Sequence, residues 1–294
     1  MSVKYRLAPQ YPLPAAQLDV LVAYLSLLYP RPDSDINPLS ASQIVFAGDS
    51  GGGSLLYNIL QIIKATANHQ PIKFHSHTVH FPLPTPAGIA TLSLAGEYLG
   101  SYPSEEENIV NDILLDVPWS VPDYPACALW PTSPPRPMIH AHTKSHTHPL
   151  FTISLQPSWA DAPPMWFAVG EEQLIDSSKA VARRAARDGV NVTWMQFEAM
   201  PHCFSTLPGL NRSKQAEMCF ERWGEFCRNC LEANEKMEQN VKAVTITFKD
   251  AEEGPLELDS EMDEKKLPLV DLERRVRDKI EKVEKDFSMA WSKL

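Results

Sequence analysis

The sequence predicts an α/β fold in which a mostly parallel sheet carries helices on both faces. Short apolar runs recur along the chain, among them "QIVFAG", "MWFAVG" and "VTWMQFEAM". Stretches with apolar residues three or four positions apart follow these runs, and alternating strands and helices are typical of a parallel sheet. With 294 residues, of which 44% are hydrophobic, the chain is long enough for one large α/β domain or two small ones.

The alternation begins within residues 1–72. The segment "VKYRLAP" at residues 3–9 is predicted to be a strand leaving the sheet, and residues 15–29 are predicted to form a helix. The run "QIVFAG" at residues 43–48 predicts a short buried strand, and residues 52–66 fit an apolar helix.

Residues 73–164 have a different character. They are rich in proline and histidine, as in "PTSPPRPM", and they show little periodicity. Such composition is typical of long loops, so we expect an insertion with one or two core elements and part of a lid.

The strand–helix pattern resumes after this insertion. "MWFAVG" predicts a strand, residues 174–188 a helix closed by Gly189, and "VTWMQFEAM" the next strand. Residues 212–240 fit one long helix. We therefore expect residues 1–240 to form the main domain.

Residues 241–294 are predicted to form a C-terminal extension: a short apolar stretch, an acidic linker and a charged helix near 269–291. One face of this helix is apolar, which predicts that it docks on its own domain. The apolar positions, spaced three and four apart, are Leu272, Val276, Ile280, Val283, Phe287 and Trp291.

Composition excludes several classes of partner and location. The net charge is −10, whereas nucleic acids and anionic membranes attract clustered Lys and Arg. No apolar run approaches the ~20 residues of a membrane span, and the first residues lack the apolar core of a signal peptide. The five cysteines form no secreted-type framework, which favours a reducing compartment.

The stretch "GDSGGG" places a single serine among glycines. Gly48-Asp49-Ser50-Gly51-Gly52 matches G-x-S-x-G between a predicted strand and a predicted helix, which is the context of a nucleophile elbow. In such an elbow the serine hydroxyl stands above the sheet edge, and the next backbone N–H supports an oxyanion. We expect Ser50 to be the nucleophile and Gly51 the oxyanion donor.

A serine nucleophile needs a base, and that base needs an acid that orients it. Glu171, Glu172 and Asp176 follow "MWFAVG", and His202 follows the next predicted strand, about thirty residues later. The carboxyl ends of parallel strands meet at one edge of a sheet, so these side chains are predicted to lie near Ser50. In folds with a nucleophile elbow, the triad residues follow one another in the chain order serine, acid, histidine.

Four segments carry a resemblance to a known family. "VKYRLAPQYPLPAAQLD", "GDSGGG", "GEEQLID" and "FEAMPHCF" resemble the Y-R-L-A-P segment, elbow, acid loop and histidine loop of hormone-sensitive-lipase-like α/β-hydrolases. The resemblance covers about residues 1–230 and implies an α/β-hydrolase fold. It implies a triad of Ser50, Glu172 and His202, with Asp176 as the alternative acid, and no cofactor.

The resemblance extends to fungal members of this branch through "ACALWPTSPPRP" and "HPLFTISL". When the C-terminal tail is included, the chain particularly resembles the hydrolases of fungal host-selective toxin clusters of the AK-, AF- and ACT-toxin type. The chain departs from the family in having no H-G-G-G oxyanion loop. We therefore expect a sheet without the family's first strands and a weakened oxyanion site.

Other side-chain clusters are weaker candidates. Two histidine groups have metal-like spacing but lie in proline-rich segments without cysteine or carboxylate neighbours, so no metal site is predicted. Cys227 and Cys230 are expected to pack within a helix. The histidines are His75, His77 and His80, and His140, His142, His146 and His148.

The chain ends in Ser292-Lys293-Leu294, and S-K-L at a C-terminus is a peroxisomal address that an import receptor reads. The sequence thus predicts a peroxisomal serine ester hydrolase of fungal secondary metabolism, with toxin biosynthesis as its setting. The substrate is a small ester or acyl thioester. Two alternatives stay open: an acyl-CoA thioesterase, and a non-catalytic binding protein that lost the oxyanion loop.

Overall fold

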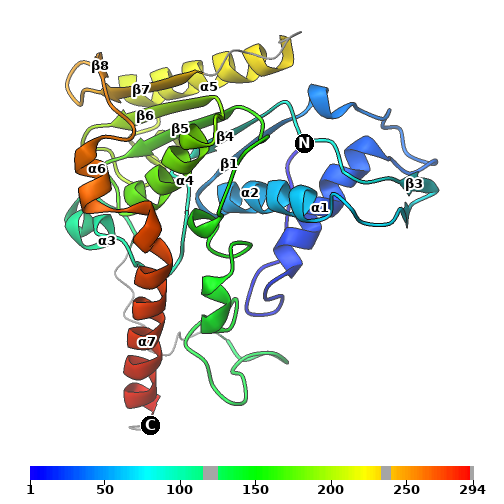
Figure 1. Ribbon diagram of the computed structural model, residues 1–294, viewed down its shortest axis with the longest axis horizontal. Helices are drawn as coiled ribbons and strands as arrows, with labels where there is room; N and C mark the ends of the chain where they lie inside the picture. Colours follow the sequence, from blue (N-terminus) through cyan, green and yellow to red (C-terminus); the bar gives the residue numbers. More distant parts are fainter. Residues whose placement is uncertain (115–124, 233–239, 292–294) are drawn as a thin grey trace.

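A computed structural model describes residues 1–114, 125–232 and 240–291. Its main sheet has the order β1-β4-β5-β6-β7-β8, and all neighbouring strands are parallel except β7 and β8 (Figure 1). The mostly parallel sheet is therefore confirmed. The strands are β1 (Val45–Asp49), β4 (Gly88–Leu92), β5 (Met165–Gly170), β6 (Val192–Phe197), β7 (Val241–Ile246) and β8 (Glu253–Pro255).

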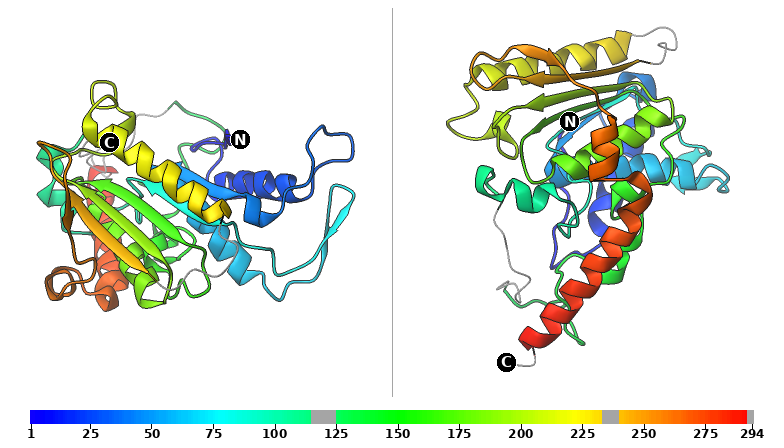
Figure 2. Two further views of the ribbon diagram at one scale, coloured as in Figure 1. Left: turned by 90° about the horizontal axis from the view of Figure 1, so that it is seen from above. Right: turned by 60° about the vertical axis from the view of Figure 1, so that its left-hand side comes forward.

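Helices cover both faces of this sheet. Helices α1 (Ala15–Leu28), α2 (Ser50–Ala65) and α4 (Ile175–Arg187) lie on one face, and α5 (Lys214–Glu232) lies on the other (Figures 1 and 2). The long helix expected over residues 212–240 is described as far as Glu232, and residues 233–239 lie outside the described part.

Alternate residues of the central strands supply the two core layers, as the pleat of a strand requires. In β5, Met165, Phe167 and Val169 pack toward α1, α2 and α4, whereas Trp166 and Ala168 pack toward α5. Burial on both faces explains why "MWFAVG" is continuously apolar rather than alternating.

The N-terminal segment differs from its prediction. Residues 3–9 form no strand, although Val3 and Tyr5 pack against the core. The reason is local: the backbone N–H and the guanidinium of Arg6 both donate to the Asp19 carboxylate on α1. The chain is thus tied to a helix rather than to a neighbouring strand. Within the described residues, the sheet pairs β1 only with β4.

The expected insertion at 73–164 contains one central element, β4, which lies between β1 and β5. A hairpin of β2 (Ile72–Phe74) and β3 (His77–Val79) precedes it. The rest of its described residues is mostly irregular, with the short helix α3 (Ser104–Glu107). The insertion also contains three brief 3₁₀ helices: η2 (Ile109–Asn111), η3 (Thr143–Thr147) and η4 (Ile153–Leu155). A further one, η1 (Ala41–Gln43), precedes β1.

The sheet continues beyond the expected domain boundary at residue 240. The apolar stretch predicted there is β7, which pairs with β6 over six residues, and β8 returns antiparallel to it. The boundary therefore falls inside the sheet. The extension proper comprises α6 (Glu261–Lys266), the 3₁₀ helix η6 (Leu269–Asp271) and α7 (Leu272–Trp291).

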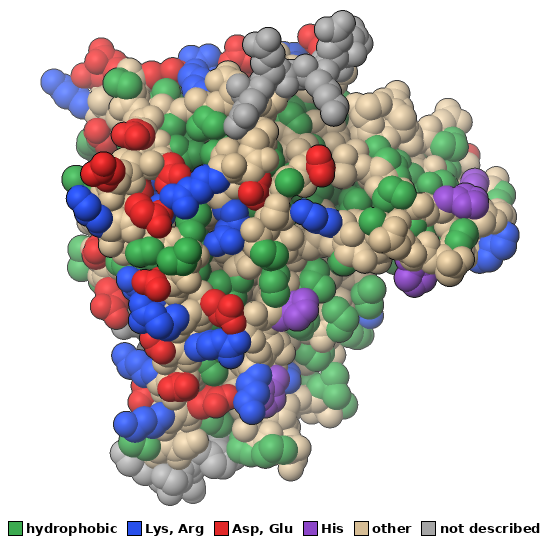
Figure 3. All heavy atoms as spheres, viewed as in Figure 1, with side chains coloured by type: hydrophobic (Ala, Val, Ile, Leu, Met, Phe, Trp, Pro, Cys, Tyr) green, Lys and Arg blue, Asp and Glu red, His purple; other side chains and the backbone are tan. Residues whose placement is uncertain are grey.

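Helix α7 packs its apolar face on the insertion. Val276, Ile280 and Val283 cluster with Leu99 and Met138, and Leu272 joins a second cluster that contains Tyr102. Acidic and basic side chains intermingle over the outer surface of α6 and α7 (Figure 3). Ion pairs also tie α6 and the segment before it to α4: Arg183 pairs with Asp259 and Glu264, and Lys179 pairs with Asp263.

Candidate active site

Ser50 stands at a sharp turn between β1 and α2. Its φ of 49° lies in the left-handed region, which is uncommon for a residue other than glycine and is typical of a nucleophile elbow. The glycines around it have different roles. A Cβ on Gly48 would come within 3.1 Å of the backbone of Gly52 and Gly53, and one on Gly53 within 3.1 Å of Leu94. These two positions let the helix start close against the strand.

His202 lies in the loop after β6, just before the 3₁₀ helix η5 (Phe204–Thr206). Its side chain is buried, and Nε2 is 2.9 Å from Ser50 Oγ. The opposite ring nitrogen, Nδ1, is 3.1 Å from Glu172 Oε1. Because an ionised carboxylate only accepts, Nδ1–H donates to Glu172, and Nε2 is left to accept the Ser50 hydroxyl proton.

Glu172 follows β5 and is fully buried. Its Oε2 accepts from Ser93 Oγ at 2.7 Å and from the Gly170 N–H at 3.2 Å. Both oxygens therefore have partners, which fixes the side chain toward His202.

Opposing effects act on the pKa of His202. Burial lowers it, but hydrogen bonding with Cys203 and Glu172 and the negative charge of Glu172 raise it, and the net pKa lies above the ordinary imidazole value. The carboxylate thus makes the imidazole a stronger base and stabilises the imidazolium that proton transfer would create.

The two neighbouring carboxylates face elsewhere. Asp176, on the first turn of α4, accepts from the Ser104 N–H at 2.9 Å and pairs with Lys266 at 3.2 Å. Glu171 accepts from the Ala199 N–H at 3.0 Å. Among the three candidate acids, the structure brings Glu172 alone into hydrogen-bond contact with His202.

Several residues that hold the triad in place were not predicted from the sequence. Besides donating to Glu172, Ser93 accepts from the Cys203 N–H at 2.8 Å, so one hydroxyl joins the acid to the histidine loop. Asp112 accepts from the backbone N–H of both His202 and Gln173 at 2.9 and 2.7 Å. The only sequence signal was the position of Ser93 directly after a short apolar run, at the same sheet edge.

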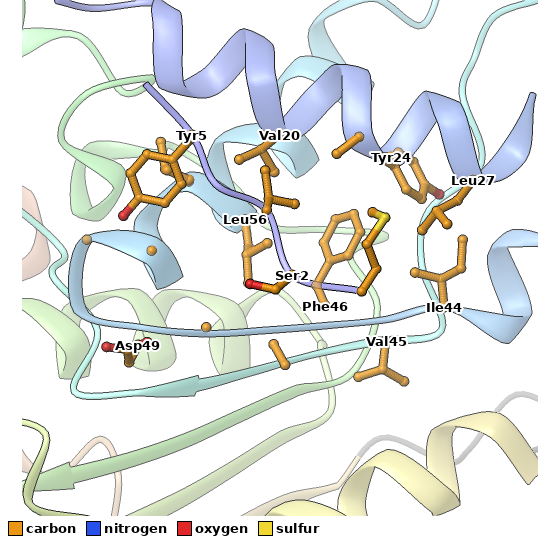
Figure 4. A pocket seen from close by; sticks show the side chains of 18 of the residues that line it. Ser2, Tyr5, Val20, Tyr24, Leu27, Ile44, Val45, Phe46, Asp49 and Leu56 are labelled. Atoms are coloured by element: carbon orange, nitrogen blue, oxygen red, sulfur yellow. The ribbon is translucent and has the colours of Figure 1, made fainter. Parts of the chain in front are cut away.

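Gly51 and Gly52 border open space rather than packed core. The nearest atoms to a Cβ built on them are Tyr98 Oη at 3.8 Å and Tyr5 Oη at 4.0 Å. A cavity of about 660 Å³ opens here and extends along β1 between α1 and α2 (Figure 4). Ser50 lies at one end of it, and apolar residues such as Val20, Leu27, Phe46 and Leu56 line the remainder.

The residues considered for metal binding have other contacts. His75 and His77 bond the carbonyls of Tyr29 and Pro30, and Cys227 and Cys230 are free thiols on α5. No group of three or more His, Cys, Asp or Glu side chains arranged for a metal occurs in the described part. Nor does any helix described here combine the length and apolarity needed to cross a membrane.

Comparison with known proteins agrees with this architecture. A family model described as alpha/beta hydrolase fold matches residues 1–206. The chain belongs to this family. The predicted α/β-hydrolase fold is thereby confirmed.

Individual relatives of this α/β-hydrolase are esterases and lipases by name. It is 26% identical over 229 residues to Lipase 2 of Moraxella sp. (strain TA144), a match that covers 72% of this chain and 48% of the relative. A hormone-sensitive lipase from a metagenome library is 27% identical with a TM-score of 0.57. An esterase of the bacterial hormone-sensitive lipase family is 24% identical with a TM-score of 0.58. This similarity shows a shared fold.

The α/β-hydrolase spans only part of each relative. It covers about half of the length of Lipase 2 and 64% of the length of each of the two solved structures. Each of these two structures matches 78% of this chain. Ser292, Lys293 and Leu294, which were predicted to form a targeting signal, lie outside the residues that the structure describes.

Proposed function

We propose that this α/β-hydrolase is a carboxylesterase-type serine hydrolase with a Ser50–His202–Glu172 triad. The observation that carries the proposal is the unbroken hydrogen-bonded series Ser50 Oγ, His202 Nε2, His202 Nδ1 and Glu172 Oε1. Nucleophile, base and orienting acid come from three separate loops at one sheet edge, and this is the arrangement that acyl transfer needs.

The geometry supports a two-stage reaction. Ser50 Oγ attacks the ester carbonyl carbon while its proton passes to His202 Nε2, and the carbonyl electron pair moves onto oxygen. The Gly51 N–H supports that oxyanion. Collapse expels the alcohol, which takes the proton from His202. Water, activated by the same imidazole, then cleaves the acyl-enzyme.

The test uses the purified full chain and p-nitrophenyl esters of short acids. We expect slow turnover that Ser50→Ala abolishes, while Ser42→Ala, which alters an exposed serine, leaves it unchanged. A fluorophosphonate should add to Ser50, as peptide mass spectrometry would show. Equal turnover by the native chain and Ser50→Ala, with no adduct on Ser50, would favour a non-catalytic binding protein.

The biological setting belongs to the same proposal. The resemblance to fungal toxin-cluster hydrolases supports a role in fungal secondary metabolism, in the biosynthesis of an ester-containing toxin. The C-terminal S-K-L supports a peroxisomal location through the import receptor.

A further inference from the structure

The elbow offers one backbone donor to a developing oxyanion, the Gly51 N–H. Oxyanion sites generally combine two or more donors, and the loss of one typically costs ~10²–10³ in rate. A second donor for this site would have to border the open space beside the first turn of α2. Two phenolic hydroxyls lie near this turn: that of Tyr98, beside Gly51, and that of Tyr5, which also lines the cavity.

Tyr98 is the better placed of the two. Its hydroxyl is the nearest atom to the Gly51 Cβ position, at 3.8 Å, whereas that of Tyr5 is 4.0 Å from the corresponding position on Gly52, one residue further from Ser50. Tyr5 enters the same space from the N-terminal segment (Figure 4). Because Gly51 has no Cβ, no side chain stands between the Tyr98 hydroxyl and the Gly51 backbone.

The ring of Tyr98 is held by its neighbours. It lies 5.3 Å from the Phe151 ring and 6.0 Å from the His140 ring, between centroids, and Phe151 and His140 stack on each other at 5.2 Å. Tyr98 also belongs to the loop after β4 that carries Ser93, the partner of Glu172. One short loop therefore reaches both the acid and the elbow.

The protonation state suits a donor. Burial raises the pKa of Tyr98 to about 12, an effect that a hydrogen bond with the Ser54 hydroxyl opposes. The phenol thus keeps its proton at neutral pH and can donate it in a hydrogen bond without losing it. Because the Ser54 hydroxyl also donates to the Ala95 carbonyl, the phenol would turn from Ser54 to donate to an oxyanion.

We infer that Tyr98 is a catalytic residue whose hydroxyl donates, together with the Gly51 N–H, to the oxyanion formed when Ser50 attacks an acyl carbonyl. This inference rests on the proposed serine hydrolase function. No proton leaves the phenol. The negatively charged oxygen accepts the hydrogen bond from Tyr98 while the tetrahedral intermediate exists. When the leaving group departs, the electron pair re-forms the carbonyl and the hydrogen bond to Tyr98 is released.

The experiment compares Tyr98→Phe, Tyr5→Phe and Tyr102→Phe on p-nitrophenyl esters. Tyr102 is the matched control, because its buried hydroxyl lies in the same segment but bonds Ser154 at 2.7 Å. We expect Tyr98→Phe to lower kcat about 10²-fold with KM within about threefold, and the other two variants to lower kcat less than about threefold. Each variant should keep the melting temperature of the native chain within a few degrees.

A second readout separates oxyanion binding from mere positioning. A trifluoromethyl ketone forms a tetrahedral adduct with Ser50 that carries an oxyanion, whereas the matching methyl ketone binds mainly without one. Tyr98→Phe should weaken the trifluoromethyl ketone in proportion to kcat and leave the methyl ketone unchanged. Unchanged kcat, equal weakening of both ketones, or a larger loss in Tyr5→Phe overturns the inference while Ser50-dependent turnover persists. A native chain without Ser50-dependent turnover overturns the proposed function as well.

Discussion

At the scale of single residues, two carboxylates four positions apart in the sequence have opposite surroundings. Glu172 is fully buried and directs Oε1 to His202 Nδ1, whereas Asp176 caps the Ser104 backbone and pairs with Lys266. Only the first can orient the imidazole, so equivalent substitutions at the two positions should have unequal effects.

We expect Glu172→Gln to lower kcat/KM by on the order of 10³–10⁴, because the imidazole loses the carboxylate that holds its tautomer. Asp176→Asn, the matched carboxylate-to-amide change, should lower it by less than about tenfold. Steady-state kinetics on one ester would measure both. A greater loss at Asp176 would transfer the acid role to that residue.

The pH dependence of activity should follow His202, which can act as a base only when it is neutral. Since its pKa is raised, the acid limb of kcat/KM should lie on the alkaline side of the ordinary imidazole value. In Glu172→Gln, the charge and the hydrogen bond that raise this pKa are lost, so the limb of the residual activity should move to lower pH. A profile measured from about pH 5 to about pH 10 checks this, and an unmoved limb would contradict it.

Part of the site could be predicted from sequence because it follows strand ends. Ser50, Glu172 and His202 each come directly after a recognisable apolar run, so the topology of a parallel sheet brings them to one edge. Ser93 and Tyr98 follow β4, in a segment whose periodicity is weak. A serine or tyrosine in a loop has no local pattern, and its role depends on contacts with residues distant in sequence.

At the scale of elements, most helices and strands were predictable, but some of their partners were not. The apolar residues of 241–246 indicated a buried segment, yet only pairing with β6 makes it a sheet strand. Residues 3–9 have strand-like composition, but the Arg6–Asp19 bonds tie them to α1. The composition of a segment indicates whether it is buried, whereas its pairing with another strand depends on contacts with the rest of the chain.

The docking of α7 gives a prediction about stability. Val276 is fully buried against Leu99 and Met138, so Val276→Ala removes packed methyl groups and should lower the free energy of unfolding by about 2 kcal/mol. Its neighbour Arg277 is exposed and pairs with Glu273 within the helix, so Arg277→Ala should cost less than about 0.5 kcal/mol. Urea denaturation of both variants measures the difference. Equal stabilities would mean that α7 is not packed as described.

At the scale of the whole molecule, the end of the C-terminal helix extends away from the sheet (Figures 1 and 2). The triad lies at the edge of the sheet. Charged residues on the outer face of α7, such as Arg274, Arg277 and Asp278, are exposed. A function carried by the end of the chain can therefore be tested without altering the triad.

The peroxisomal prediction concerns that end. A receptor that reads S-K-L needs the terminal carboxylate and the last side chains, so the signal should depend on Ser292, Lys293 and Leu294 and not on catalysis. We expect a fluorescent protein fused before residue 1 of the chain to be punctate in fungal cells and to overlap a peroxisomal marker. Deletion of the three residues should make it diffuse, whereas Ser50→Ala should leave it punctate. If the intact fusion fills the cytosol, the tripeptide does not act as an address, and the similarity to toxin-cluster hydrolases loses its main support.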